Sequence, residues 1–249
     1  MSEVLLKIEN LNKSFGITHA NVNINFELKA GEVRGLAGEN GSGKSTLLSQ
    51  IAGLYGSDSG KMYIRGEEYS PKNPVDANNH KVAMVVQELG MIGSLPASIN
   101  IYLGKTKKFI KMNDLQDQAN AVSDRWGLPR VNLKRMAGSM NIENRKMVEL
   151  IRALAADPDI LILDEVTQSL SHDNRKVLYN LIEKFKGEGR SIILISHDLD
   201  EAIQLTDSIS ILRDGELLET ISSEGLNEDI LKRKMVGREL VSYTHLRAH

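Results

Sequence analysis

The chain has 249 residues, of which 41% are hydrophobic and 26% are charged, an ordinary soluble composition that is large enough for one α/β domain with an inserted lobe. The formal net charge of −2 argues against a nucleic-acid-binding surface built on bulk charge, and no apolar run approaches the roughly 20 residues of a membrane span. Zero cysteines exclude disulfides and thiolate metal sites. The first ten residues carry charges where a signal peptide needs an apolar stretch, so we expect a cytoplasmic protein.

Alternating apolar residues near the N-terminus indicate β-strands. The stretch EVLLKIENL, residues 3–11, alternates with a period of two. With the rest of the first thirty residues and KMYIRGEEY, residues 61–69, it predicts a small antiparallel sheet.

Three short apolar runs predict buried parallel strands, each followed by polar residues. They are EVRGLAG (residues 32–38), ILILDE (residues 160–165) and SIILISHD (residues 191–198). The first and the third lead into the helical patterns KSTLLSQIAGL and LDEAIQLTD. Strand, turn and helix repeated in this way indicate an open α/β sheet with its ligand at the carboxyl ends of the strands.

The turn after the first run has the pattern of a phosphate-binding loop. GENGSGKST matches G-x-x-x-x-G-K-[ST] between a predicted strand and a predicted helix, and a chance glycine-rich turn would lack that register. The glycines let the backbone wrap around phosphate oxygens, and the N–H groups at the start of the helix point toward them. Lys44 adds a charge near the β- and γ-phosphates, and the Ser45 hydroxyl can ligate Mg²⁺. The predicted nucleotide-binding residues of the loop are Gly38, Glu39, Asn40, Gly41, Ser42, Gly43, Lys44, Ser45 and Thr46.

The segment of about residues 88–154 differs from the rest of the chain. It has long helical patterns, MNDLQDQANAVSDRWGL and NRKMVELIRALA, and no comparable strand, which predicts a helical lobe inserted in the core. We therefore expect the core and the β subdomain to occupy about residues 4–87 and 155–225. Within the lobe, the basic run KTKKFIK, residues 105–111, fits a solvated face better than a lipid contact.

Polar residues at the strand ends predict the chemistry of the site. Asp164 is placed to hold Mg²⁺ through its water shell, and Glu165 can polarise an attacking water; the alternative is an acidic pair on the surface. His197 would contact the γ-phosphate or orient the water, unless it is a structural histidine. Gln87, between core and lobe, fits a sensor of the γ-phosphate and of Mg²⁺. The predicted catalytic residues are thus Glu165, His197 and Gln87, and the predicted metal ligands are Ser45, Gln87 and Asp164.

The order of these motifs resembles that of an ABC-transporter ATPase. The motifs are GENGSGKST, VVQEL (residues 85–89), LILDE (residues 161–165), TQSLS (residues 167–171) and ISHDLDEA (residues 195–202). The resemblance covers about residues 4–240 and implies a P-loop NTPase core with a small antiparallel β subdomain and an inserted helical lobe. It also implies ATP and Mg²⁺ as cofactors. Phe15 matches the aromatic residue that stacks on adenine, the alternative being a core phenylalanine.

Within the family, several stretches look most like importers of simple sugars of the ribose and galactose type. They are QELGMIGSLPASINIYLG, RKMVELIRALAADPDILILDE and MVGREL (residues 235–240), the last resembling the join between two fused ATPase halves. The resemblance implies the N-terminal half of a twin ATPase, with the linker between the halves starting within about residues 226–240. We expect that the natural chain is cut near Leu240, because VSYTHLRAH, residues 241–249, lacks periodicity and is the translation of DNA that resembles a transposon-end adapter. The alternative is a disordered native tail.

One motif departs from the family pattern. Members carry a signature close to L-S-G-G-Q, whereas residues 140–144 read MNIEN. The signature caps the ATP of the opposite unit with N–H groups at a helix N-terminus, so Ile142 would prevent close approach and Glu143 would place a carboxylate against an anion. Asn141 and Asn144 could still donate hydrogen bonds. A homodimer would have this defect at both sites and a twin at one, which favours half of a twin.

The resemblance implies an ATP hydrolase that is peripheral on the inner face of the cell membrane, although an isolated half can be inactive. Its expected partners are integral-membrane permease subunits, a second ATPase half and, indirectly, a solute-binding protein, with no nucleic acid. The solute itself is not predicted. Three alternatives remain open: a homodimeric ATPase for another small solute such as an amino acid, a soluble factor acting on ribosomes or nucleic acid, and a regulator that binds nucleotide without hydrolysis.

Overall fold

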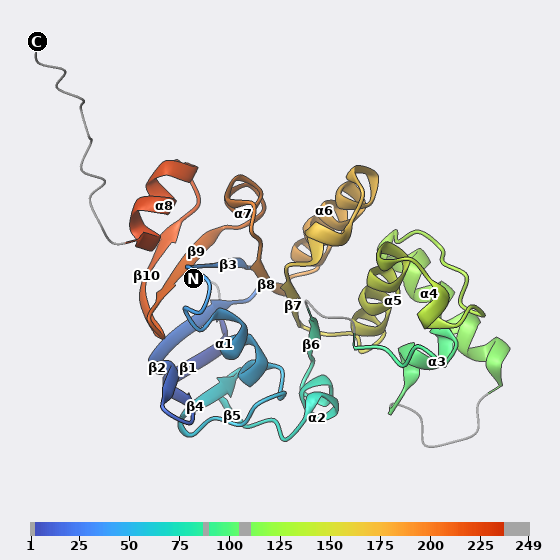
Figure 1. Ribbon diagram of the computed structural model, residues 1–249, viewed down its shortest axis with the longest axis horizontal. Helices are drawn as coiled ribbons and strands as arrows, with labels where there is room; N and C mark the ends of the chain where they lie inside the picture. The colour runs from blue at the N-terminus through green and yellow to red at the C-terminus, as the bar shows by residue number, and fades with distance from the viewer. Residues whose placement is uncertain (1–2, 87–89, 105–110, 237–249) are drawn as a thin grey trace, which may run out of the picture.

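A six-stranded sheet in the order β10-β9-β3-β8-β7-β6 forms the centre of the fold (Figure 1). The structure, a computed structural model, describes residues 3–86, 90–104 and 111–236. The strands from β9 to β6 are parallel to their neighbours, and β10 pairs with β9 in antiparallel fashion at one edge. The strands are β3 (Val33–Ala37), β6 (Val82–Val85), β7 (Ile160–Asp164), β8 (Ser191–Ile195), β9 (Ser208–Arg213) and β10 (Glu216–Ser222).

The three apolar runs predicted as buried parallel strands are confirmed as β3, β7 and β8. Every residue of each strand is buried. In the sheet β3 lies beside β8, and β8 lies beside β7. The polar residues that follow these strands therefore meet at one edge of the sheet. Sequence analysis missed β6, because a strand of four residues is too short to show a period.

The predicted antiparallel sheet is confirmed, with the order β2-β1-β4-β5. In β2 the side chains of Ile24, Phe26 and Leu28 are buried while the residues between them are exposed, as expected for a strand with one face on the core. This sheet packs with α1 against one face of the central sheet. The elements are β1 (Val4–Phe15), β2 (Thr18–Lys29), β4 (Ser59–Ile64), β5 (Glu67–Tyr69) and α1 (Lys44–Ile51).

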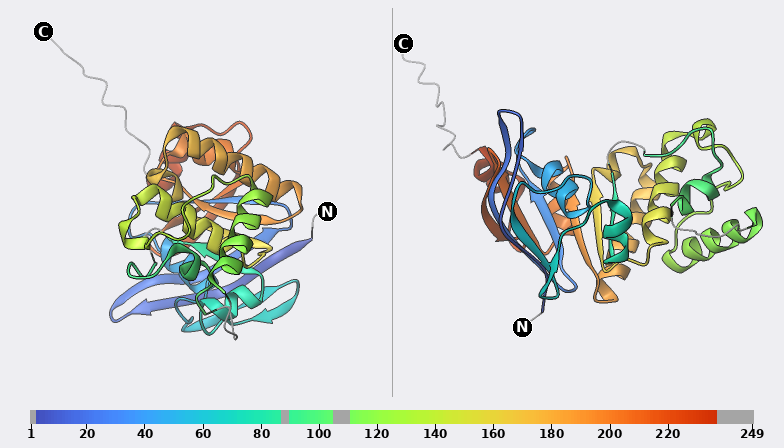
Figure 2. Two further views of the ribbon diagram at one scale, coloured as in Figure 1. Left: turned by 90° about the vertical axis from the view of Figure 1, so that its right-hand side faces the viewer. Right: turned by 90° about the horizontal axis from the view of Figure 1, so that it is seen from below.

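The helices between β6 and β7 gather on the side of the central sheet away from the antiparallel sheet (Figures 1 and 2). The part of residues 90–154 that the structure describes holds no strand beyond an isolated bridge between Pro96 and Met136. The limits of the lobe stay predictions, because residues 87–89 at its start lie outside the described residues. The elements are α3 (Ala97–Tyr102), α4 (Met112–Trp126), the 3₁₀ helix η1 (Ala137–Ser139) and α5 (Ile142–Leu154).

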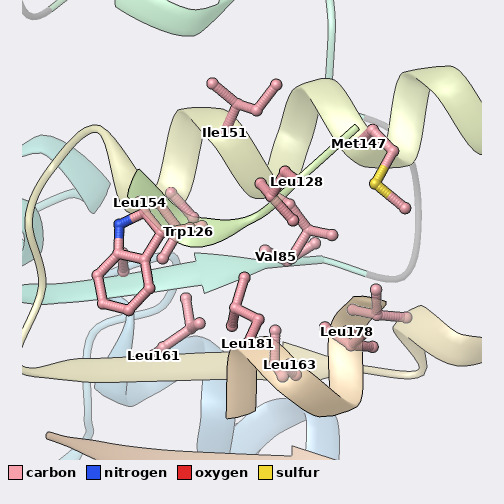
Figure 3. Close-up of a cluster of buried hydrophobic side chains, with 14 of the residues drawn as sticks. Val85, Trp126, Leu128, Met147, Ile151, Leu154, Leu161, Leu163, Leu178 and Leu181 are labelled. Atoms are coloured by element: carbon pink, nitrogen blue, oxygen red, sulfur yellow. The ribbon is translucent and has the colours of Figure 1, made fainter. Parts of the chain in front are cut away.

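One continuous hydrophobic cluster joins these helices to the sheet (Figure 3). Met147 and Ile151 of α5, Val85 of β6, and Leu161 and Leu163 of β7 all belong to this cluster. The alternate residues of β7 face the opposite cluster, which includes α1 and the antiparallel sheet. A strand buried on both faces explains why its sequence is a continuous apolar run.

The remaining helices pack against the central sheet: α6 belongs to the cluster shared with the lobe, α2 to the cluster on the opposite face, and α7 and α8 to a third, smaller cluster. In α8 the side chain of Leu231 is fully buried against β9 and α7, so part of the segment predicted to begin a linker is a packed helix. Residues 105–110 of the basic run, 237–240 of MVGREL and the predicted tail 241–249 lie outside the described residues. None of the described helices is long and apolar enough to cross a bilayer. The elements are α2 (Pro74–Asn79), the 3₁₀ helix η2 (Val166–Ser169), α6 (His172–Gly187), α7 (Leu199–Leu205) and α8 (Glu228–Val236).

Replacing Phe185 tests the contact between the lobe and the core. Phe185 is fully buried, and its ring centroid lies 5.3 Å from that of Trp126, the chain's only tryptophan. Phe185→Ala lowers the free energy of unfolding by about 3–5 kcal/mol, because it leaves a cavity in the core. It also shifts the Trp126 emission to the red as water reaches the indole.

Urea denaturation followed by fluorescence measures both effects. Ile17→Ala is the control, because Ile17 is 97% exposed and its loss changes stability by less than about 0.5 kcal/mol. An unchanged emission maximum in folded Phe185→Ala would contradict the contact.

Candidate functional site

The predicted phosphate-binding loop connects the end of β3 to the start of α1. Gly43 caps the helix with a φ of 98°, a conformation that favours glycine. A Cβ atom added there would lie 2.3 Å from the carbonyl oxygen of Ala20, and one added at Gly38 would lie 2.2 Å from that of Leu212. The side-chain amide of Asn21 donates to the Gly43 carbonyl at 3.1 Å. The loop is thus clamped between β2 and β9, and glycine is required at both of its ends.

Lys44 lies across this loop. Its Nζ atom donates to the carbonyl oxygens of Gly38, at 2.8 Å, and Glu39, at 2.9 Å. Burial lowers the pKa of Lys44, while the nearby carboxylates of Glu165 and Asp164 oppose that shift. The ammonium group is therefore held where phosphate oxygens would meet the loop, in an environment that favours an added anion.

Asp164, the last residue of β7, has an unsatisfied buried oxygen. The residue is 3% exposed, and its Oδ1 atom accepts no hydrogen bond. Burial and the neighbouring Glu165 raise the pKa of Asp164 to about 6, against a hydrogen bond with Ser45 and the charge of Lys44. A carboxylate oxygen without a donor, beside a serine hydroxyl, is the kind of oxygen site that Mg²⁺ takes. In the part of the chain that the structure describes, no group of three or more His, Cys, Asp or Glu side chains is placed to hold a metal ion.

Glu165 and His197 form a pair across the ends of β7 and β8. The Nε2 atom of His197 lies 2.6 Å from Oε1 of Glu165. The Glu165 side chain is 8% exposed and that of His197 is 47% exposed, so the acid is shielded while the imidazole reaches solvent. Glu165 has a φ of 52°, and its backbone N–H donates to the Ile195 carbonyl at 3.0 Å. The left-handed backbone turns the carboxylate toward the histidine at the point where the strand ends.

A cavity of about 400 Å³ contacts both the loop and this pair. Sequence analysis missed Thr18 and Ala20 on its wall, because a turn and a strand start carry no chemical motif; their only signal is their place shortly after Phe15. The cavity is lined by Thr18, Ala20, Asn40, Gly41, Gly43, Lys44, Ser45, Thr46, Glu165 and His197.

Two other predicted site residues that the structure describes, Phe15 and Ser42, do not line this cavity. Phe15 is 45% exposed, with its ring 5.2 Å from that of Tyr55 in an edge-on arrangement and 5.5 Å from the ammonium of Lys13. The alternative of a core phenylalanine is therefore wrong, while stacking on adenine stays a prediction. Ser42 is buried with its hydroxyl unpaired. Gln87 lies outside the described residues.

The polar groups at the start of α5, the position of the family signature, are hydrogen-bonded within the chain. Asn141 caps the helix by accepting the backbone N–H of Asn144 at 2.8 Å with its side-chain oxygen. That the two asparagines donate hydrogen bonds to a nucleotide stays a prediction. Glu143 accepts from the backbone N–H of Ser171 and the side-chain amide of Asn174, both at 2.7 Å. Hydrogen bonding with the Ser171 side chain, then with Asn174 and the Ser171 backbone, lowers the pKa of Glu143. Donors at the start of α6 therefore hold the Glu143 carboxylate, while its approach to an anion of an opposing unit stays a prediction. Ile142 is 56% exposed beside them.

Two further charges on α5 hold the backbone on either side of residues 87–89. Lys146 and Glu149 form an ion pair of 3.0 Å with side chains that are 1% and 0% exposed. Lys146 donates to the carbonyl of Val86 at 2.7 Å, and Glu149 accepts the N–H of Gly90 at 2.8 Å. Sequence analysis did not find this pair, because nothing in the sequence shows that these charges turn inward.

Comparison with known proteins places these features in context. Residues 22–168 match the family described as ABC transporter. The L-arabinose transport ATP-binding protein of Geobacillus stearothermophilus is 36% identical over 249 residues, which is 97% of this chain and 48% of the relative. The ribose import ATP-binding protein of Rhodococcus jostii is 33% identical over 240 residues, which is 95% of this chain and 48% of the relative. The chain thus spans about half the length of the curated relatives it matches.

Solved structures share the fold. A bacterial ABC transporter cassette in a dimeric structure has a TM-score of 0.78 at 24% identity, and the match covers 89% of this chain and all of that one. An ATP-binding cassette of an ABC transporter in its ADP conformation has a TM-score of 0.76 at 22% identity, covering 94% and 95% of the two chains. The predicted fold class is confirmed.

Replacing Asp164 measures the electrostatic cost of burying its carboxyl group. Its pKa is about 6 in the folded chain and ordinarily 3.8, so the unfolded chain loses the proton first as the pH rises. The ionised carboxyl group therefore lowers the free energy of unfolding progressively as the pH rises from 3.8 to about 6. We expect Asp164→Asn to raise the free energy of unfolding of the nucleotide-free chain by about 2–3 kcal/mol near pH 7.5, and by little near pH 4.

Urea denaturation of the wild type and the variant across this pH range tests the prediction. A stability difference that does not change with pH would contradict the raised pKa.

Proposed function

The chain belongs to the ABC transporter family, and on that premise we propose that it is the ATP-binding and hydrolysing unit of an importer for a simple sugar. The observation that carries the proposal is the convergence of Lys44, Asp164 and the Glu165–His197 pair at the ends of three adjacent strands. A phosphate loop alone would support binding, whereas a shielded carboxylate beside it supplies a base for hydrolysis. Relatives named for L-arabinose transport and ribose import support a sugar as the solute.

The geometry assigns a task to each side chain. Lys44 and the N–H groups of the loop bind the β- and γ-phosphates. Mg²⁺, when bound, supplies positive charge that stabilises the negative charge of those oxygens, and Ser45, Asp164 and Gln87 would hold it. Glu165 orients the attacking water and accepts its proton. His197, 2.6 Å from Glu165, keeps the carboxylate turned toward the cavity and reaches the γ-phosphate side with its exposed imidazole.

A second ATPase unit of different sequence is part of the proposal. The start of α5 would have to offer free N–H groups to the nucleotide of an opposing unit. Here the Asn144 N–H is already bonded to Asn141, and the half-exposed Ile142 adds bulk next to it. A pair of identical chains would have this weak cap at both sites, whereas a different partner can supply a better one to the site of Lys44 and Glu165.

An apolar groove marks the surface proposed for a membrane-embedded permease. The groove has a volume of about 320 Å³ and lies between α2, the end of β6 and the lobe. Leu54, Val75 and Leu103 line it and are 45–50% exposed. It also contacts Val86 and Gly90, the two residues held by the buried ion pair of α5. We propose that a cytoplasmic segment of the permease docks here, with the unit peripheral on the inner face of the membrane and a solute-binding protein acting through the permease.

ATP turnover across a wide range of chain concentration tests the need for a second unit. We expect tight Mg-ATP binding with negligible turnover of the chain alone at every concentration, because no adequate cap is present. Glu165→Gln should bind as tightly as the wild type, and Lys44→Ala should bind at least about tenfold more weakly, a loss of about 1.4 kcal/mol.

Two results would contradict the proposal at different points. Turnover that rises steeply with concentration and disappears in Glu165→Gln would mean that the chain works as a homodimer. Failure to bind Mg-ATP would remove the ATPase function itself.

Charges placed in the groove test the permease contact. We expect Val75→Glu combined with Leu103→Glu to raise the Kd of the chain for membranes that carry its permease by at least about tenfold, equivalent to about 1.4 kcal/mol, because a buried charge opposes docking. Co-sedimentation with the membranes measures this Kd. Mg-ATP binding should not change. Ile17→Glu, on a fully exposed residue, is the matched control. Equal sedimentation of both variants would place the contact elsewhere.

A further inference from the structure

A buried carboxylate on α7 gathers hydroxyl groups from three segments of the chain. Glu201 is 5% exposed. Its Oε2 atom accepts hydrogen bonds from Ser196 at 2.5 Å and from Thr167 at 2.7 Å, and its Oε1 atom accepts one from the Tyr179 hydroxyl at 2.5 Å. Its own backbone N–H donates to the side chain of Asp198 at 3.0 Å, which fixes the first turn of α7. Glu201 thus sits in a single well-defined position.

Two of these hydroxyls belong to the segments that carry the proposed catalytic pair. Thr167 follows Glu165 by two residues and is 3% exposed. Ser196 directly precedes His197. One carboxylate oxygen therefore joins the segment after β7 to the segment after β8, next to the Glu165–His197 contact.

Packing alone does not explain a carboxylate at this place. Burying a charge costs free energy, and an apolar side chain of similar size is often no less stabilising. In the described part of the chain Glu201 makes no ion pair, so three neutral donors hold the group. Burial and the neighbouring Glu201 raise the pKa of Tyr179 to about 12, which keeps its phenol protonated as a donor.

We propose that Glu201 is a positioning residue for the Glu165–His197 pair. It fixes the end of β7 relative to the end of β8, so that the Glu165 carboxylate stays in hydrogen-bond reach of the His197 imidazole. Its importance for ATP hydrolysis rests on the proposed function, whereas its effect on the pair does not. Glu201 is not on the wall of the nucleotide cavity, and its loss should therefore leave Mg-ATP affinity within about twofold.

The test measures the pair directly in the full chain. Side-chain ¹⁵N spectra of the histidines report whether Nε2 of His197 is hydrogen-bonded, with His197→Gln to assign the signal and Glu165→Ala as the reference for a broken pair. We expect the Glu201→Ala signal to move to that reference. Glu201→Gln, which keeps an acceptor oxygen for Ser196 and Thr167, should restore most of the wild-type signal. Glu143→Ala is the matched control for Glu201→Ala, because it loses hydrogen bonds to the start of α6 without touching the pair.

The outcomes separate a positioning role from a structural one. A wild-type His197 signal in folded Glu201→Ala overturns the inference, even if the melting temperature falls. If Glu201→Ala does not fold, Ser196→Ala and Thr167→Val each remove one of the two bonds, and each should shift the signal part of the way. No shift in either variant overturns the inference as well.

Turnover distinguishes this inference from the proposed function. In a transporter with its second unit, Glu201→Ala should lower kcat at least about tenfold with an unchanged KM for ATP, about 1.4 kcal/mol of barrier. A wild-type kcat there overturns the role in hydrolysis. If the His197 signal moves as expected in a chain that neither binds nor hydrolyses ATP, the positioning holds and the proposed function fails.

Discussion

The parallel hydrogen bonds that join β3 to β8 and β8 to β7 set the distances within the site. The register places Asp164 beside Ile195 and Gly35 beside Leu194, so the three strands end at nearly the same level. Neighbouring strands lie about 4.8 Å apart, so the segment after β8 begins about one strand spacing from those after β3 and β7, and these two begin about two spacings apart. The loop, the acidic residues and the histidine come from distant parts of the sequence, yet each needs only a short turn to reach the cavity. The packing of both sheet faces by apolar clusters keeps this register fixed.

The charged groups at this edge of the sheet lie in an environment that shifts the pKa values of Asp164 and Lys44 toward their neutral forms. Two carboxyl groups and one ammonium share a buried region, where the pKa of Asp164 is raised and that of Lys44 is lowered. The charged forms of Asp164 and Lys44 are therefore less stable here than they would be in water. In the proposed function, the phosphate chain would bring an anion to Lys44 and its cation would approach Asp164, which would stabilise both charged forms. Such fixed charges need little rearrangement when nucleotide binds, and this is the property that favours electrostatic catalysis.

The sequence predicted those parts of the site that local pattern controls. Fully buried strands produce apolar runs that are visible in the sequence. The phosphate-binding loop needs glycine at the position where a Cβ atom would meet the Ala20 carbonyl, so it is visible as a glycine-rich motif. Contacts between side chains far apart in the sequence leave none. Glu143 is bound to residues 28 and 31 positions away, and Glu201 to a threonine 34 positions away. The family resemblance could place a departure at Ile142 and Glu143, but only the tertiary structure shows that the carboxylate is turned inward.

The hydrogen bonds along α5 make this helix a rigid rod fastened at both ends. At its start Glu143 is bonded to the first residues of α6, and toward its end Glu149 and Arg152 are bonded to Gly90. The span from Glu143 to Arg152 is roughly 14 Å at the rise of an α-helix. An α-helix is stiff along its axis, so α5 connects Gly90, on the wall of the apolar groove, to the Asn141 cap as one rigid element. In the proposed function, a permease segment in the groove and an opposing ATPase unit at the cap would therefore contact the two ends of the same helix.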